Sequence, residues 1–194
     1  LERGTGALPA AIAAYEHAVA LRPTYKQAHN NLGVAYAAAG RAADAEASYR
    51  RAIAIDAHYA PAWLNLGQQL ASAGRTDEAV VALRRALTAR PAHVETTIEL
   101  ARALVTFGRA DEGARELRAL LVISPRQVAV WRELGAIEES RGRSAEALDA
   151  WRRGLEVDPD DVATLRRLGA LELRLGHLPQ ARVALEDLLD HQPA

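Results

Sequence analysis

The sequence predicts an all-α protein, a solenoid of antiparallel helix pairs with about 11 helices. Two regular series of helix-breaking residues support this prediction, because both divide the chain into repeats of 34 residues. Between the breakers, apolar residues recur at i, i+3, i+4 and i+7, the spacing of an amphipathic helix. Each repeat is therefore predicted to be a helical hairpin.

Glycine forms the first series, which runs through the whole chain. Its members are Gly6, Gly40, Gly74, Gly108, Gly142 and Gly176. Glycine adopts positive φ angles without steric strain, so it commonly follows the last residue of a helix. We expect each one to end the first helix of a pair and to turn the chain into the second. Thr76 and Ser144, two residues after their glycines, are expected to be N-caps of second helices.

Proline forms the second series and is expected to end the second helix of each pair, because it cannot continue a helix. It occupies Pro23, Pro91, Pro125, Pro159 and Pro193, with Ala57 at the one vacant position. Residues 1–194 are thus predicted to form a single domain. Residues 1–25 are the second half of a truncated repeat, and five whole repeats follow at 26–59, 60–93, 94–127, 128–161 and 162–194.

Small residues mark a position on each first helix where its partner helix is expected to cross. They are Gly33, Gly67, Ala101, Gly135 and Gly169. A larger side chain there would push the helix axes apart. We interpret the aromatic residues of the same hairpins, such as Trp151, as part of the shared core. A ligand pocket is the alternative interpretation of these residues.

Composition and motifs exclude several classes of function. The chain has 24 basic and 25 acidic residues and no contiguous basic stripe, which argues against nucleic-acid binding. It has no cysteine and no apolar run long enough to insert into a membrane. Its histidines lack metal-ligand spacing, and no nucleophile or phosphate-loop motif occurs. We therefore expect no metal, no cofactor and no catalytic residue.

The pattern W-x₂-L-G-x₂-Y, then A-x₃-F, then P, is typical of one family of helical repeats. The third repeat follows it with Trp63, Leu66, Gly67, Leu70, Ala79, Leu83, Ala86 and Pro91. The chain thus resembles the tetratricopeptide repeat (TPR) family over essentially its whole length. The resemblance implies a right-handed α-solenoid whose first helices line a concave inner surface. Lys26 is the only lysine, and this arginine bias indicates a GC-rich, bacterial genome.

Function is expected on that concave surface. The candidate binding residues are Gln27, Asn30, Asn31, Val34, Leu64, Asn65, Gln68, Ile98, Glu99, Arg102, Arg132 and Glu133. Amide side chains can pair with the backbone of an extended peptide whatever its side chains are. Asn31 and Asn65 hold the same position in consecutive repeats, which is similar to the asparagine ladder of the O-linked N-acetylglucosamine transferase family. Solvated polar residues on a helix face are the alternative interpretation.

Two functions remain open. The first is a non-catalytic scaffold that binds a peptide or a partner segment in the concave groove. The second is a substrate-recruiting arm of a larger enzyme, such as an O-linked N-acetylglucosamine-transferase-like glycosyltransferase or a bacterial sulfotransferase. A clamp for the C-terminal carboxylate of chaperones is not expected, because Glu95 and Glu99 occupy clamp-like positions and would repel the ligand.

The ends of the sequence indicate a fragment of a longer protein. The chain begins at Leu1 with half a repeat, and it stops after Pro193 without a polar capping helix. Terminal repeats of a solenoid normally need such a cap. We therefore expect either flanking protein or self-association through the uncapped ends. A cytoplasmic location is the expectation for this chain.

Overall fold

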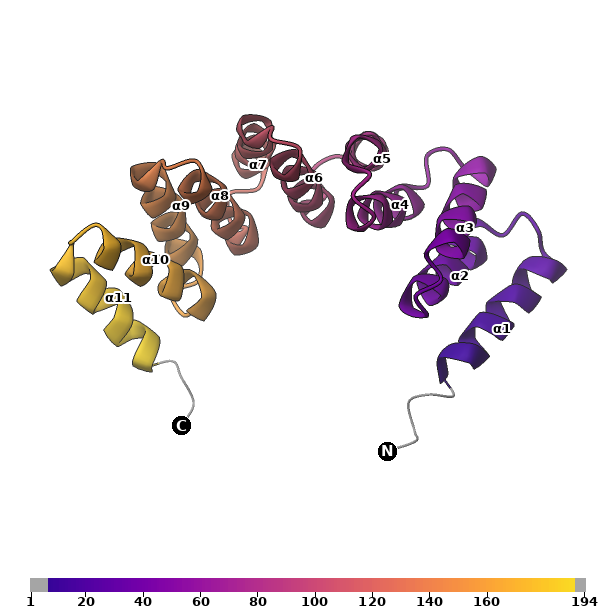
Figure 1. Ribbon diagram of the computed structural model, residues 1–194, viewed down its shortest axis with the longest axis horizontal. Coiled ribbons are helices and arrows are strands. Elements are labelled where there is room, and N and C mark those ends of the chain that lie inside the picture. Colours follow the sequence, from indigo (N-terminus) through magenta and orange to yellow (C-terminus); the bar gives the residue numbers. More distant parts are fainter. Residues whose placement is uncertain (1–6, 191–194) are drawn as a thin grey trace. The chain divides into compact units, whose positions relative to one another are not determined.

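The computed structural model describes residues 7–190, and that part of the chain is all α-helical, with eleven helices and no strand (Figure 1). The predicted fold class is thus confirmed. The helices are α1 (Ala7–Leu21), α2 (Lys26–Ala38), α3 (Ala42–Ile55), α4 (Ala60–Ser72), α5 (Thr76–Ala89), α6 (Val94–Thr106), α7 (Ala110–Ile123), α8 (Val128–Ser140), α9 (Ser144–Val157), α10 (Val162–Arg174) and α11 (Leu178–Asp190).

The glycines end the first helices as predicted. Each of the five described ones lies two residues beyond the last residue of α2, α4, α6, α8 or α10, with φ between 73° and 77°. A side chain at such a backbone angle would be strained. Prolines follow the second helices in the same way, and Pro91, for example, lies two residues after the end of α5. Gly6 and Pro193 lie outside the described residues.

The predicted N-caps are wrong. Thr76 and Ser144 are the first residues inside α5 and α9, and the cap positions belong to Arg75 and Arg143, whose side chains make no cap hydrogen bond. The helix starts one residue earlier than expected because the Arg75 carbonyl already accepts from the N–H of Ala79, at 3.0 Å. Acidic residues in the first turn favour this end of the helix instead, through the helix dipole.

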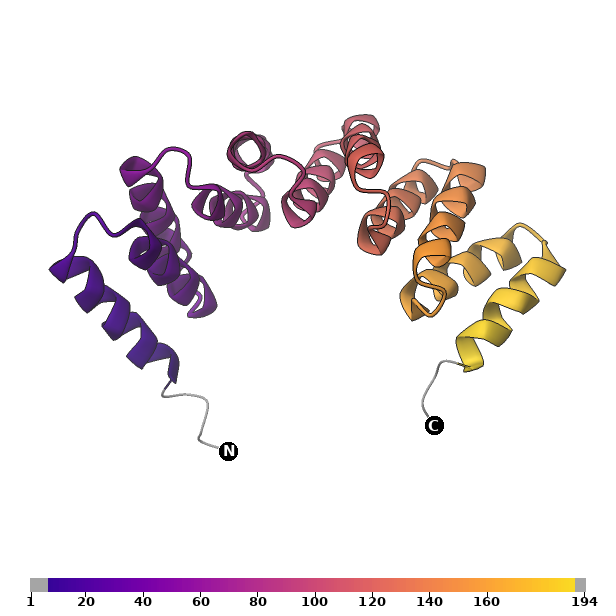
Figure 2. The ribbon, with the colours of Figure 1, turned by 180° about the vertical axis from the view of Figure 1, so that it is seen from behind.

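The chain divides into two compact units, unit 1 (Leu1–Ala103) and unit 2 (Leu104–Ala194). In unit 1, helices α1 to α5 each pack against the next. In unit 2, helices α7 to α11 do the same (Figures 1 and 2). Each unit has its own apolar core, built around Tyr36, Tyr49 and Leu70 in unit 1 and around Trp151 and Leu171 in unit 2.

The small residues on the first helices allow close packing, as the sequence predicted. A Cβ added to Gly33 would lie 2.5 Å from the Tyr49 ring. The same atom on Gly135 would lie 2.2 Å from Nε1 of Trp151, a side chain with no exposed surface. Helices of one hairpin are thus held at a separation that a larger residue would change.

Candidate functional site

Amide side chains link the first helices of unit 1. The Asn65 Nδ2 on α4 donates to Oδ1 of Asn30 on α2 at 2.9 Å. Asn30 is only 6% exposed, and its Nδ2 donates in turn to Oδ1 of Asn31 at 3.4 Å. Asn31 is exposed and Asn65 is half-buried. The buried Asn30 therefore fixes the side-chain direction of the two outer asparagines.

The other candidate residues of unit 1 differ in how far they reach the surface. Gln27 and Val34 on α2 are exposed, whereas Leu64 on α4 is 9% exposed and belongs to the core. A cavity of 200 Å³ borders Leu64 and also touches Arg90. The remaining ones are the half-buried Gln68, Ile98 and Glu99, and the exposed Arg102, which donates to Glu99 at 3.2 Å.

The last two candidates, Arg132 and Glu133, lie on α8 in unit 2 and are half-buried. Arg132 Nη1 donates to Oδ1 of Asp161 at 2.8 Å, and Asp161 caps α10 by accepting from the Thr164 N–H at 3.0 Å. Burial alone would raise the pKa of Asp161, but hydrogen bonds from Thr164 and Arg132 outweigh burial and hold that pKa below its ordinary value. The Arg132 guanidinium is therefore already engaged within its own repeat.

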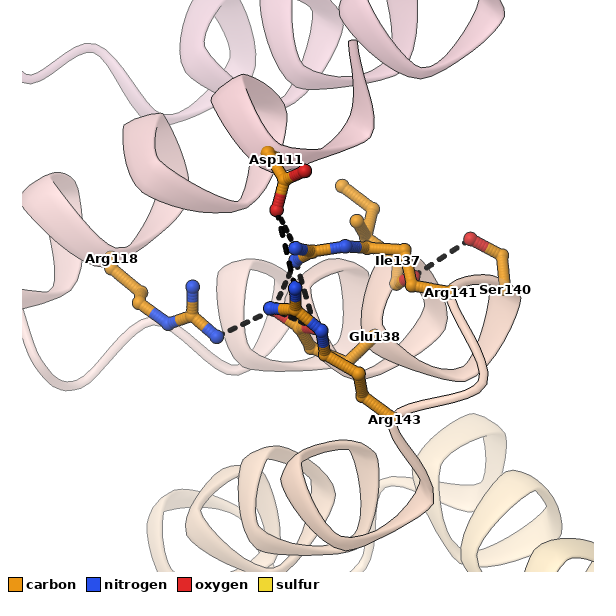
Figure 3. Close-up of polar contacts among 7 residues, drawn as sticks. All are labelled: Asp111, Arg118, Ile137, Glu138, Ser140, Arg141 and Arg143. Carbon is orange, nitrogen blue, oxygen red and sulfur yellow. Dashed lines mark hydrogen bonds and ion pairs between the residues drawn. The ribbon is translucent and has the colours of Figure 1, made fainter. Parts of the chain in front are cut away.

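Two buried glutamates in unit 2 escaped the sequence analysis. Glu138 has no exposed surface, and it accepts from Arg118 of α7 and from Arg141 at 2.9 Å (Figure 3). Figure 3 shows Arg143 and Asp111 completing the cluster from either side. A charge that is fully buried is tolerated when it is paired in this way. Glu138 thus joins the second helix of one repeat to the first helix of the next.

The same inter-repeat contact recurs with changed chemistry. Glu172, 1% exposed, pairs with Arg152 from the preceding second helix, and also with His177 at 2.6 Å. In unit 1 the equivalent partners are Tyr36 and Glu16, whose side chains form a hydrogen bond of 2.6 Å. That hydrogen bond raises the pKa of Tyr36. In each case the residue on the first helix and its partner on the preceding second helix are 20 residues apart. That spacing could have revealed the contact.

Two grooves also escaped prediction. One, of 340 Å³, lies between α3 and α5 in unit 1, with Trp63 of α4 among its lining residues. The other, of 680 Å³, lies between α7 and α9 in unit 2 and is lined by Trp131 of α8. Both tryptophans are half-buried, whereas Trp151 is a core residue, as interpreted from the sequence. Trp63 and Trp131 thus each line a groove, whereas Trp151 does not.

Between residues 7 and 190, no group of three or more His, Asp or Glu side chains is placed to hold a metal ion. None of the helices in that range combines the length and the apolar character that crossing a bilayer requires. The arrangements that the described residues do show are the linked amides, the buried ion pairs and the two apolar grooves.

Comparison with known families agrees with this geometry. Four models of the tetratricopeptide repeat match, at residues 2–40, 28–55, 70–136 and 128–171. The chain is a tetratricopeptide repeat protein, and such proteins act as scaffolds for protein–protein interaction. No curated protein matches the sequence.

Solved structures share the fold at low sequence identity. MamA is 22% identical over 78% of this chain and 89% of its own, with a TM-score of 0.71. YrrB, described as a TPR protein with an unusual peptide-binding site, is 19% identical over 94% of both chains, with a TM-score of 0.69. The pilF protein of Pseudomonas aeruginosa is 17% identical over 93% of this chain and 79% of its own, with a TM-score of 0.73.

Proposed function

We propose that the chain is a non-catalytic scaffold that binds an extended peptide on the first helices of unit 1. The observation that carries this proposal is the hydrogen bond from Asn65 to the buried Asn30. It orients the outer amides before any ligand arrives, so binding costs little side-chain entropy. Asn31 and Asn65 then offer donors and acceptors to a peptide backbone.

Two further observations support the proposal. Exposed Gln27 and Val34 extend the surface along α2, which combines amide and aliphatic contacts. A structure of the same fold, YrrB, is described as having a peptide-binding site. Arg132 and Glu133 belong to unit 2, so we propose for them a separate contact with the partner. A cytoplasmic location and self-association through the ends stay predictions.

The test is selection of random peptides from a display library against the whole chain, followed by calorimetric titration of the selected peptides. Asn31→Ala should weaken binding about fivefold, because one hydrogen bond contributes ~1 kcal/mol. Gln180→Ala is a matched control, because it removes an exposed amide from α11 in unit 2.

Leu64→Ala is a poor test, since Leu64 is 9% exposed and its truncation would also lower stability. Asn65→Ala is informative beside Asn31→Ala when thermal unfolding is measured for both. Selected peptides that bind wild type, Asn31→Ala and Asn65→Ala with equal affinity would contradict the proposal. A selection that enriches no peptide would contradict it as well.

A further inference from the structure

The two tryptophan grooves occupy equivalent places in the two units. Trp131 follows Trp63 by two repeats, and Ile53 and Leu66 of the first groove correspond to Leu121 and Leu134 of the second. In both grooves two second helices form the walls and a first helix carries the tryptophan. The grooves thus occupy equivalent positions in the repeat, although their volumes are 340 Å³ and 680 Å³.

In unit 2 the chain supplies its own cation to the groove. The Arg153 guanidinium lies over the Trp131 ring, 5.6 Å from the centroid, and Asp149 one turn earlier holds it by an ion pair of 2.9 Å. A guanidinium over an indole face is attracted by the ring quadrupole. This intramolecular contact shows that a cation on an aliphatic stem, flanked by a carboxylate, fits beside the tryptophan.

In unit 1 the same groove lacks this internal occupant. Val81 stands at the position of Asp149 and is 59% exposed, so Arg85 has no carboxylate one turn before it. Within the described residues, no cation over the Trp63 ring is found, whereas five other rings have one. The Trp63 groove therefore presents an apolar floor and the exposed Val81 to an outside group.

Charge on the rim of the Trp63 groove favours a basic occupant. Asp77 and Glu78 line it together with Arg50. Arg50 is already engaged, because it contacts Glu46 at 2.8 Å and lies 3.8 Å from Glu78. Asp77 is exposed in the first turn of α5. Glu78 is engaged as well, because Arg75 pairs with it at 2.6 Å. Asp77 is therefore the rim carboxylate that can meet a cation from outside.

We propose that the groove between α3 and α5 binds an amphipathic partner helix that is basic. An aliphatic side chain of this helix packs on Trp63 and Val81, and a neighbouring lysine or arginine pairs with Asp77. Two parallel helical walls with an apolar floor suit a third helix. Such a helix is anchored by apolar side chains at positions i and i+4. This surface is formed by second helices, so it is separate from the peptide surface proposed on the first helices.

The test uses two synthetic peptides and the indole N–H resonances of the whole ¹⁵N-labelled chain. Both peptides are alanine-based helices of about 18 residues with two leucines four apart, and they differ only in carrying lysine or glutamate beside the leucines. Trp63 and Trp131 are matched reporters, because each Nε1 donates to a backbone carbonyl at 2.8 Å. The lysine peptide should shift the Trp63 resonance saturably. Its dissociation constant should be at least tenfold lower than that of the glutamate peptide.

Two variants exchange the chemistry of the grooves. Val81→Asp copies Asp149 at an exposed position and should abolish the Trp63 response by drawing Arg85 over the ring. Asp149→Val should release Arg153 and make the Trp131 resonance respond to the lysine peptide. Asn31→Ala should leave both responses unchanged, which separates this proposal from the peptide surface. An unshifted Trp63 resonance, equal affinity for the two peptides, or full binding by Val81→Asp would overturn the proposal.

Discussion

The two units solve the same packing problem with different chemistry. Where one repeat meets the next, unit 1 places Tyr36 and Leu70 at a position that Glu138 and Glu172 hold in unit 2. Leu70 needs only a space of the right shape, and Tyr36 in addition donates one hydrogen bond to Glu16. The buried glutamates in addition need an arginine from the preceding repeat.

This difference teaches that the repeat frame fixes the geometry of a contact but leaves its polarity free. When the residue at this position is polar, the residue 20 places earlier forms a hydrogen bond with it: Glu16 accepts from Tyr36, and Arg118 donates to Glu138. A buried ion pair is sensitive to loss of one partner, whereas an apolar contact loses free energy only in proportion to the removed volume. Unit 2 should therefore be the more sensitive unit to single substitutions at these contacts.

The largest expected effect is that of Glu138→Ala. Its loss leaves the Arg141 side chain, 10% exposed, with Asp111 as its remaining carboxylate partner. The free energy of unfolding should fall by about 3–5 kcal/mol, measured by urea denaturation followed by tryptophan fluorescence. Urea is preferred because guanidinium salts would screen the ion pairs.

The double variant Glu138→Leu with Arg141→Ala is the matched control for that experiment. It introduces the residue types that unit 1 has at the equivalent positions, Leu70 and Ala73. Because charge and partner are removed together, its stability should lie within about 1–2 kcal/mol of wild type. If Glu138→Ala proves as stable as the double variant, the buried ion cluster does not distinguish the two units.

The second effect concerns the small residues at the helix crossings. Gly135→Ala should destabilise unit 2 by about 1–3 kcal/mol, since the new methyl group meets the rigid, fully buried Trp151. Gly67→Ala in unit 1 meets the flexible Leu83 at 2.6 Å and should cost less. Gly169→Ala, 3.1 Å from Leu185, should be close to neutral, because alanine also favours the helix by about 1 kcal/mol.

Thermal unfolding of the three variants checks this order. A smaller cost for Gly135→Ala than for Gly169→Ala would show that the crossing position does not set the helix separation.

These features differ in how far the sequence predicts them. Helix ends and crossing positions follow from local properties, the φ preference of Gly74 or the size of Gly67, and the repeat shows them directly. The burial of Asn30 beside the exposed Asn31 does not follow, because adjacent residues on a helix differ by only about 100° in direction. Glu138 was missed because a charged residue at an apolar position is acceptable only through its partner in another repeat.

The smallest expected effect is the loss of a carboxylate charge that ties neighbouring segments together. Asp161 in unit 2 and Asp56 in unit 1 are the two carboxylates to compare. Asp161→Asn should lower the free energy of unfolding by ~1 kcal/mol near pH 7, because the ionised form accepts from Thr164 and Arg132. Asp56 is more exposed, and hydrogen bonds from Lys26 and the His58 N–H lower its pKa, so Asp56→Asn should have a smaller effect.

The pH dependence of stability shows whether the charge of Asp161 stabilises the folded state. The pKa of Asp161 is lowered in the folded state, so its contribution is present above the unfolded value of about 3.9 and disappears as the pH falls through the folded value. Urea denaturation between about pH 3 and 7 should therefore show wild type and Asp161→Asn converging on the acid side. A difference that stays constant over this range would mean that the Asp161 charge does not stabilise the fold, and that the cap hydrogen bond alone matters.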